Sequence, residues 1–583
     1  MRMLILFCLF AQTAFGANYF IDPVKGSDSH SGKSRTTAYR SFARLNKLVL
    51  KAGDRVYVYP GRFDTSLQLS AQGTPARPVV VLFAPGQYDF YNTNAYRAKL
   101  HISNTNDVPD GLKAVAIRIA NAKYVTIQGE GAKLVMHAKM IETFVDHSQN
   151  ISITGLSYDY ATPTVSEFTV NNISQNTADV KVNNDSHYVI KDSVLYWEGE
   201  GWQYKNSWYW QEYNPADGFV TRTNVQFGKA KFEAIAPNLI RVHFPANPGL
   251  KSGYVYQTRD VTRDCAGIFL QRSKNISLNN IRIYFMHGMG VVSQFCDNIS
   301  INKLTVKPAR GRTCAAWADI LHFSGCMGLV SVRNSYLSAA NDDAINVHGV
   351  HLRIIEQPAP NQLKVRFMHG QTYGFMPYMP GDSVDLVHGA SLLPFAGNLV
   401  KAALMLNAHD VLLTLQKPVT DTLVNDDVIE NITWTPRVQI QNTTMASIPT
   451  RGVLITTRRP VLISQNHFVR LAGSGVLVAN DAESWYESGP VKNLQIADND
   501  FISCGGPVIS IHPENTRHDG PVHSNISITN NRFTLKGAEL LSAKSTAGIK
   551  FTNNQVSLAP GADTSRLFKF VNCTDVVNNY KAK

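Results

Sequence analysis

A short unit with an asparagine near its end recurs along the chain, and this repeat constrains the fold more than any other feature. Each unit is an alternating apolar stretch followed by Asn, one residue of any type, and an apolar or aromatic residue, as in Ile496–Phe501. The asparagine falls at 279, 302, 334, 442, 466, 499, 531 and 554, at intervals of 23, 32, 108, 24, 33, 32 and 23 residues. Period-two strands at this spacing predict an all-β fold, a parallel β-helix whose coils stack about 4.8 Å apart. Asn suits the corners because it tolerates left-handed backbone and hydrogen-bonds along a ladder.

Two long interruptions of the repeat predict inserted domains. About 100 surplus residues separate Gly155 from Asn279, and about 85 separate Asn334 from Asn442, measured against a coil of the repeat. Both stretches are rich in alternating strands, so we expect two small β-barrel-like insertions. The predicted layout is a signal peptide at 1–16, β-helix at 17–158, a barrel at 159–258, aspartate-bearing coils at 259–349, a second barrel at 350–430, and β-helix at 431–583.

The N-terminus predicts export. Arg2 precedes a short apolar run at 4–10, and Ala14-Phe15-Gly16 forms a small-x-small cleavage site. The run is too short to span a bilayer, and no later segment is long and apolar enough to do so. We therefore expect a secreted or periplasmic protein with no membrane span.

The cysteines and the net charge bear on which metals and macromolecules the protein could bind. Six cysteines follow residue 16 without a CxxC pair, so the sequence predicts no zinc site and leaves disulfides and buried thiols equally open. Arg2 is the one charged residue in 1–16, so its removal takes the formal net charge from +12 to +11. No long basic run or nucleic-acid motif accompanies this charge, which predicts a diffuse basic surface and no nucleic-acid partner.

Three aspartates fall together once two successive coils are aligned. The segment 318–325 lies 24 residues before 342–349, which stacks Asp319 beside Asp343. The same alignment stacks His322 beside Asn346 and Ser324 beside His348.

Such a cluster suits hydrolysis. Like charges at this distance force at least one pKa upward, and general acid–base chemistry needs that split. We interpret Asp319 and Asp343, about 5 Å apart, as a pair that holds one water, and Asp342 as a separate acid. A separation of about 6.5–9.5 Å between acid and base would invert the anomeric centre. The alternatives are turn residues satisfied by backbone amides, and a calcium site.

Other polar residues share this region. Arg451 follows Asn442 by nine residues, as Asp343 follows Asn334, so we expect it one rung beyond Asp343. There it could orient a sugar hydroxyl or keep the base ionised. The loop 481–487 offers an indole face and carboxylates to a sugar, with a packed surface loop as the alternative. The predicted substrate-binding residues are His322, Asn346, His348, Arg451, Asp481, Trp485, Glu487 and Gln294. We expect no cofactor and no metal.

The segments 318–326, 341–349 and 485–489 resemble glycoside hydrolase family 110, and the resemblance covers nearly the whole mature chain. It implies a right-handed parallel β-helix with barrel insertions and the activity of an inverting exo-α-1,3-galactosidase. It further implies Asp342 as general acid and Asp319 with Asp343 as water-activating bases. The implied partner is a galactose-terminated oligosaccharide or glycoconjugate, of blood group B type or linear; a homodimer is left open.

Two other functions fit a β-helix with polar loops. One is a different polysaccharide-degrading enzyme, either a polygalacturonase-like hydrolase or a lyase. A lyase would use Lys or Arg as its base and often Ca²⁺. The other is a non-catalytic glycan-binding β-helix.

Overall fold

The computed structural model describes residues 16–537, 539–561 and 563–580. These residues form β-strands joined by turns, with no α-helix among them. The predicted signal peptide lies outside the described residues except for Gly16. The 3₁₀ turns are η1 (Arg35–Thr37), η2 (Leu45–Lys47), η3 (Phe227–Lys229) and η4 (Thr564–Arg566).

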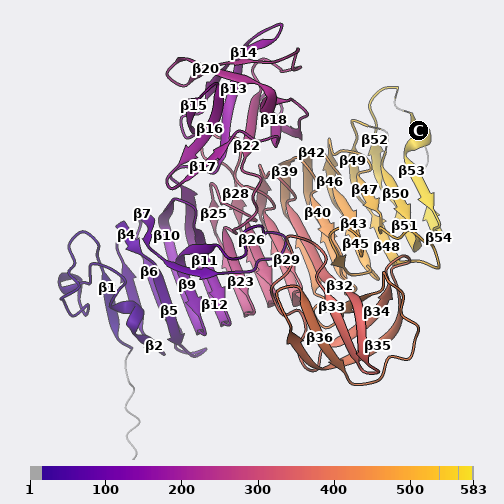
Figure 1. The fold of residues 1–583 in the computed structure, drawn as a ribbon, viewed down its shortest axis with the longest axis horizontal. Coiled ribbons are helices and arrows are strands. Elements are labelled where there is room, and N and C mark those ends of the chain that lie inside the picture. The colour runs from indigo at the N-terminus through magenta and orange to yellow at the C-terminus, as the bar shows by residue number, and fades with distance from the viewer. Residues whose placement is uncertain (1–15, 538, 562, 581–583) are drawn as a thin grey trace, which may run out of the picture.

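Three stacks of parallel strands build a long helix, which runs horizontally in Figure 1. The first stack is β1 (Asn18–Ile21), β3 (Arg55–Val58), β6 (Val79–Phe83), β10 (Lys123–His137), β12 (Gln149–Tyr160), β24 (Lys274–Asn279), β27 (Asp297–Asn302), β30 (Met327–Arg333), β38 (Arg437–Gln441), β41 (Val461–Ser464), β45 (Leu494–Ala497), β48 (His523–Thr529), β51 (Thr546–Thr552) and β54 (Thr574–Asn578). The second is β4 (Gly61–Thr65), β7 (Gly86–Asn94), the ends of β10 and β12, β25 (Arg282–Ile283), β28 (Thr305–Val306), β31 (Tyr336–Ser338), β39 (Thr444–Ile448), β42 (His467–Leu471), β46 (Asp500–Ile502), β49 (Arg532–Thr534) and β52 (Gln555–Ser557).

The third stack carries the aspartate-bearing segments at the starts of its strands. It is β5 (Leu67–Gln72), β9 (Leu112–Ala120), β11 (Ile141–Asp146), β23 (Ile268–Gln271), β26 (Val291–Gln294), β29 (Leu321–Ser324), β32 (Ile345–Ala359), β40 (Val453–Ile455), β43 (Val476–Val478), β47 (Ile509–Ile511), β50 (Leu541–Lys544) and β53 (Phe568–Val571). Short strands β2 (Val49–Lys51) and β8 (Tyr96–Lys99) flank its first members.

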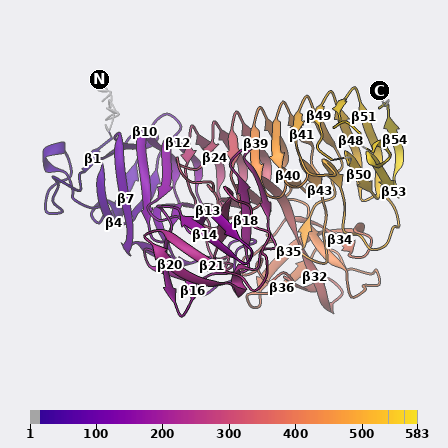
Figure 2. The ribbon, with the colours of Figure 1, turned by 90° about the horizontal axis from the view of Figure 1, so that it is seen from above.

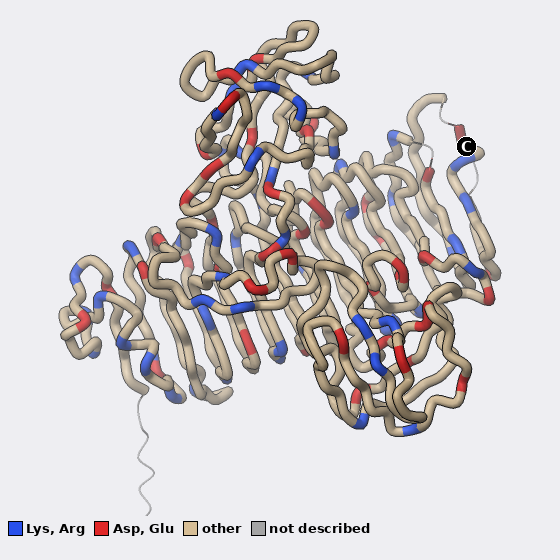
Figure 3. The backbone as a smooth tube through the Cα atoms, viewed as in Figure 1, with Lys and Arg blue, Asp and Glu red and all other residues tan. Residues whose placement is uncertain are grey.

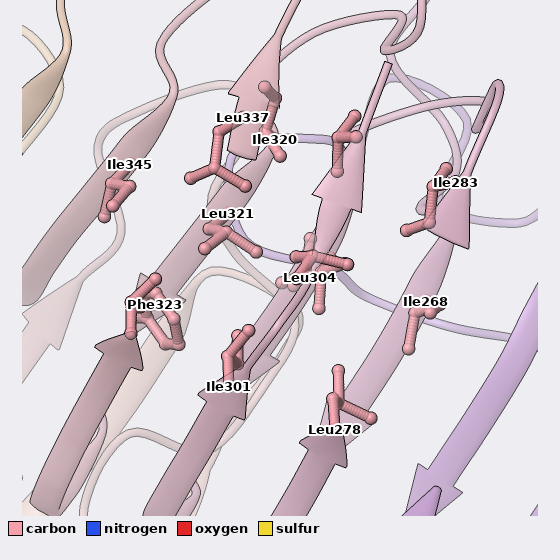
Figure 4. Packing of buried hydrophobic residues seen from close by; sticks show 14 of the residues in the cluster. Ile268, Leu278, Ile283, Ile301, Leu304, Ile320, Leu321, Phe323, Leu337 and Ile345 are labelled. Atoms are coloured by element: carbon pink, nitrogen blue, oxygen red, sulfur yellow. The ribbon is translucent and has the colours of Figure 1, made fainter. Parts of the chain in front are cut away.

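Apolar side chains of alternate strand positions fill the inside of the coils. Figure 4 shows Leu278 and Ile301 from adjacent coils of the first stack beside Leu321, Phe323 and Ile345 of the third, all directed between the stacks. This continuous core is what the period-two pattern of short strands produces when every coil has the same cross-section. The predicted parallel β-helix is confirmed.

The asparagines form two ladders. Amides of 279, 302, 334 and 442 hydrogen-bond one another along the outside at 2.7–2.8 Å. Those of 466, 499, 531 and 554 do so at 2.9–3.0 Å, and the first three of these asparagines are buried while Asn554 is half-buried. The repeated asparagines are not always paired with one another along the strands. The register shifts by one residue at two places, since Asn302 pairs with Arg333 and Gln441 pairs with Ser464.

The first insertion is antiparallel and follows β12. One sheet has the order β19-β18-β22-β13-β14-β21-β20, and a second has the order β15-β16-β17. Their bounds are β13 (Val165–Ser174), β14 (Thr177–Val182), β15 (His187–Lys191), β16 (Val194–Gly199), β17 (Trp202–Lys205), β18 (Trp210–Asn214), β19 (Phe219–Arg222), β20 (Lys231–Ala236), β21 (Leu239–His243) and β22 (Val255–Arg259). Trp197, Trp202 and Trp210 lie in its core, whereas Trp208 is 75% exposed.

The second insertion grows directly out of a helix strand. β32 pairs in parallel with β29 and β40, then continues into antiparallel pairing with the insertion. Its other strands are β33 (Gln362–Arg366), β34 (Ser383–His388), β35 (Leu393–Met405), β36 (Asp410–Leu415) and β37 (Val428–Asn431). β44 (Glu487–Ser488) pairs with the middle of β32. Seen from above, both insertions project from the same side of the β-helix (Figure 2). The predicted domain bounds stay predictions.

Charged residues of both signs are spread along the chain, and the cysteines carry free thiols. Lys and Arg are interspersed with Asp and Glu over the β-helix and both insertions (Figure 3). The six cysteines after residue 16 are free thiols, and Cys573 alone of them is not fully buried. Within the described residues, no helix has the length and apolarity needed to cross a membrane.

The interior ladder predicts a stability difference. Asn499 accepts hydrogen bonds from the backbone N–H and side-chain amide of Asn466, and both asparagines are at most 1% exposed. Asn499→Ala leaves these buried donors unpaired and should lower the free energy of unfolding by about 2–3 kcal/mol. Urea unfolding followed by circular dichroism measures it. The matched control is Asn302→Ala on the partly exposed ladder, where water replaces the lost partner and about 1 kcal/mol or less is expected. Equal losses in the two variants would contradict the argument.

Candidate active site

A cavity of about 160 Å³ lies over the strand starts of the third stack. Asp319 precedes β29, Asp342 and Asp343 precede β32, and Arg451 precedes β40. The cavity is lined by Asn104, Arg263, Met289, Asp319, Asp342, Asp343, Asn346, Arg451, Leu454, Leu477, Ala479, Asp481, Trp485, Glu487 and Glu514. Eight of these residues were expected from the sequence.

Strand register brings the predicted neighbours together. His322 pairs with Asn346 and Ser324 with His348, as expected. The expected position of Arg451 is also confirmed: the N–H of Ala344 donates to its carbonyl at 3.1 Å, which places Arg451 one rung beyond Asp343.

The three carboxyl groups are closer than expected. The backbone N–H of Asp343 donates to Oδ1 of Asp319 at 3.1 Å. One carboxylate oxygen from each of Asp319, Asp342 and Asp343 lies within 4.8 Å of the others. The expected separation of 6.5–9.5 Å between Asp342 and the pair is therefore not found between these oxygens. The loop that carries Asp342 turns back toward Asp319 rather than away from it, so distance gives no independent argument for inversion.

Asp343 is immobilised by hydrogen bonds. Its carboxylate accepts from the backbone N–H of Arg451 at 3.0 Å and from the Thr450 hydroxyl at 2.5 Å. The Arg451 guanidinium adds Nε at 2.9 and 3.0 Å and Nη2 at 2.6 Å. These five contacts use the roughly four lone pairs that a carboxylate offers. Asp343 therefore has little capacity left to grip a water, and Asp319 is the freer member of the pair.

Two arginines that the sequence did not single out hold Asp342. Arg263 Nη2 lies 2.8 Å from its Oδ2, and Arg222 Nη2 lies 3.3 Å from its Oδ1. Burial alone would raise the pKa of Asp342, but the surrounding guanidinium groups, led by Arg263 and Arg222, outweigh it and lower that pKa. Neither arginine belongs to the coil repeat, so no spacing in the sequence marks it.

Asp319 has the opposite electrostatics. It is buried, and burial followed by repulsion from Asp342 and Asp343 raises its pKa well above the ordinary value. Its Oδ2 contacts His322 Nδ1 at 2.9 Å. The free protein thus has one carboxyl group that favours a proton and one that favours ionisation, the split that the clustering of aspartates predicts.

The loop 481–487 forms a wall of the cavity. Asp481 accepts hydrogen bonds from the backbone N–H groups of Glu483, Ser484 and Trp485, so its carboxylate shapes the loop itself. The Trp485 ring stacks on His369 of the second insertion at 4.1 Å between centroids. Glu487 accepts from the side-chain amide of Asn104 at 2.7 Å.

Three predicted substrate ligands do not reach the cavity. The described residues that line the cavity do not include Gln294, His322 or His348. Gln294 lies outside the cavity with its amide already engaged: the amide oxygen accepts from the backbone N–H of Ser103, and the amide nitrogen donates to the carbonyl of His101. It fastens the N-terminal segment to the coil. The two histidines lie behind Asp319.

The calcium alternative fits the carboxylates but not their surroundings. Three carboxylate oxygens within 4.8 Å resemble part of a Ca²⁺ site. However, Arg222, Arg263 and Arg451 already supply three positive charges at these carboxylates. A divalent cation would have to displace them, so charge balance disfavours a metal here.

A second cavity of about 610 Å³ adjoins the first. Trp208, Tyr209 and Arg222 of the first insertion and Gln371 of the second line it. Four residues line both cavities, namely Asp342, Arg263, Arg451 and Trp485, whereas Asp319 and Asp343 line only the smaller one. Asp342 therefore lies where the two cavities meet. We call the smaller one, lined by the buried Asp319 and Asp343, the inner cavity, and the larger one, lined by the exposed Trp208, the outer cavity.

Comparison with known proteins agrees with this architecture. The family models for GLAA-B β-barrel domains I and II match residues 166–256 and 362–429, the two insertions. Alpha-1,3-galactosidase A of Akkermansia muciniphila is 42% identical, covering 93% of this chain and 92% of its own. Alpha-1,3-galactosidase A of Bacteroides thetaiotaomicron is 36% identical, covering 86% and 90%, and alpha-1,3-galactosidase B of that organism is 32% identical, covering 81% and 80%. Likeness over the β-helix and both barrels shows that this chain belongs to the family its aspartate motifs resemble, glycoside hydrolase family 110.

Proposed function

We propose that this protein is an exported, exo-acting α-1,3-galactosidase that removes terminal α-1,3-linked galactose from glycans. The observation that carries the proposal is the aspartate cluster in a cavity of about 160 Å³, in a chain whose relatives are named alpha-1,3-galactosidases. A small inner space takes one terminal sugar and leaves the rest of the glycan outside, which favours exo action.

The two cavities support a division of roles. A galactose in the inner cavity would place its glycosidic oxygen toward the outer one, where Asp342 is the carboxyl group shared by both. This position suits Asp342 as the general acid that protonates the leaving group. Asp319, with Asp343 fixed beside it, then activates the water, and inversion follows from in-line attack.

In the free protein, the protonation states of Asp342 and Asp319 are the opposite of those that this assignment needs. Asp342 is paired with Arg222 and Arg263, whereas the proton favours Asp319. For Asp342 to act as acid, the bound sugar must weaken these ion pairs and let a proton reach Asp342 from the outer cavity. The reverse assignment, with Asp319 as the acid, follows from the free protein's electrostatics alone. The two assignments differ in how variants treat a leaving group that needs no protonation.

Asp342→Asn should separate the assignments. If Asp342 is the acid, this variant loses about 10²–10⁴-fold in kcat/KM on an α-1,3-galactosyl disaccharide. It should lose far less on α-galactosyl fluoride, because fluoride departs without a proton. Asp319→Asn should lose activity on both substrates. Fluoride release and galactose release are measured for both variants and the wild type. They give, for each protein, the ratio of its activity on the fluoride to its activity on the disaccharide. Preferential rescue of Asp319→Asn by the fluoride would instead make Asp319 the acid.

The substrate and stereochemistry are tested together. Purified protein is given a blood-group-B-type oligosaccharide and a linear α-1,3-galactosyl disaccharide, and the product is followed by NMR. Galactose should be released with β configuration first, because water attacks the face opposite the leaving group. An α-1,4-galactosyl disaccharide is the linkage control. Release from neither α-1,3 substrate would refute the proposed function, and initial α-galactose would refute inversion.

A further inference from the structure

Two buried histidines extend from Asp319 away from the cavity. His322 Nδ1 lies 2.9 Å from Asp319 Oδ2, and His322 Nε2 lies 3.0 Å from His348 Nε2. His348 Nδ1 lies 2.7 Å from the carbonyl oxygen of Gly349. Both rings are at most 1% exposed, and strand pairing between β29 and β32 fixes their positions. They do not line the cavity and so need another role.

The carbonyl of Gly349 sets the direction of this chain of contacts. A carbonyl only accepts, so His348 Nδ1 carries a hydrogen. Burial lowers the pKa of His348, and in the neutral ring its Nε2 is then an acceptor. His322 must therefore donate from Nε2, which leaves the lone pair of its Nδ1 facing the carboxyl group of Asp319.

A lone pair facing a carboxylate at 2.9 Å requires a proton between them. The proton resides either on Asp319 Oδ2 or on His322 Nδ1. Burial lowers the pKa of His322 to about 4, while burial and the neighbouring aspartates raise the pKa of Asp319. In the free protein both effects favour the proton on Asp319. The charged and titratable groups that face this pair from the surrounding segments are Asp342, Asp343, Arg263, Arg451 and Glu487.

We propose that His348, acting through His322, is a positioning residue that holds one proton on the Asp319–His322 pair. The inference rests on the proposed function only in its kinetic readout. While His348 accepts from His322, the pair cannot lose its proton without leaving two electron pairs in contact. Without that acceptor, His322 can adopt the other tautomer and donate Nδ1–H to an ionised Asp319. The pair then releases its proton at lower pH.

His348→Leu removes the acceptor at similar volume. We expect one limb of the kcat/KM–pH profile to move toward lower pH by about one unit. The direction is the same for either role of Asp319: the acidic limb moves if Asp319 is the base, and the basic limb moves if it is the acid. His348→Gln should stay near wild type, because its amide oxygen can accept from His322 while its NH₂ group faces Gly349. His523→Leu, which removes a buried histidine in distant coils, controls for packing.

Infrared spectroscopy gives a readout that needs no activity. The protonated carboxyl band that disappears in Asp319→Asn should persist at neutral pH in the wild type and titrate at lower pH in His348→Leu. An unmoved profile and an unmoved band in that variant would overturn the proposal, as would equal shifts in the Leu and Gln variants. A wild type that shows the band but releases no galactose would refute the proposed function and leave the proposed role of His348 standing.

Discussion

Backbone pairing between coils determines which side chains meet in this protein. The N–H of Ile320 donates to the carbonyl of Asp343 at 2.9 Å, and the N–H of Ala344 donates to that of Arg451 at 3.1 Å. Parallel pairing of this kind places equivalent positions of successive coils about 4.8 Å apart whatever their charge. Asp319 and Asp343 are thus forced together, and the next residue in the row is an arginine. The cluster is tolerable because the row continues with the opposite charge.

This constraint explains what the sequence could predict. The sequence predicts the places of three residues correctly, Asp343, Asn346 and Arg451, because their positions follow from counting residues between coils. The count still holds after a long insertion if the chain returns to the β-helix in the same register. The one-residue drifts at Arg333 and Ser464 occur in the first stack and leave the pairing of β29, β32 and β40 intact.

What the sequence could not predict comes from segments outside the repeat. Arg222 belongs to the first insertion, Arg263 to the segment that returns from it, and Asn104 to an N-terminal loop. Their approach to the aspartates depends on tertiary packing, for which residue spacing carries no information. Gln294 lies outside the cavity for a related reason: the repeat gives its coil correctly, but Gln294 pairs with Ser324, three positions along the strand from the pair Val291–Leu321. The separation of Asp342 from its neighbours failed because a loop conformation decides it.

The insertions do more than add ligands. Strand starts on a β-helix face are open to water, where three carboxylates would all ionise. The first insertion contributes Arg222, and the second contributes His369, which stacks on Trp485, so residues of both insertions help to cover the cluster. Enclosure strengthens both the repulsion on Asp319 and the attraction on Asp342, because each acts through less water. Hydrogen bonds from Arg451 and Thr450 hold the carboxylate of Asp343 in place, so it cannot move away from Asp319 and Asp342. The proton is left to Asp319 and its histidine, while Asp342 lines both cavities. A parallel β-helix alone stacks Asp319 beside Asp343; residues outside the repeat, Arg263 and Arg222 above all, make the three carboxyl groups chemically unequal.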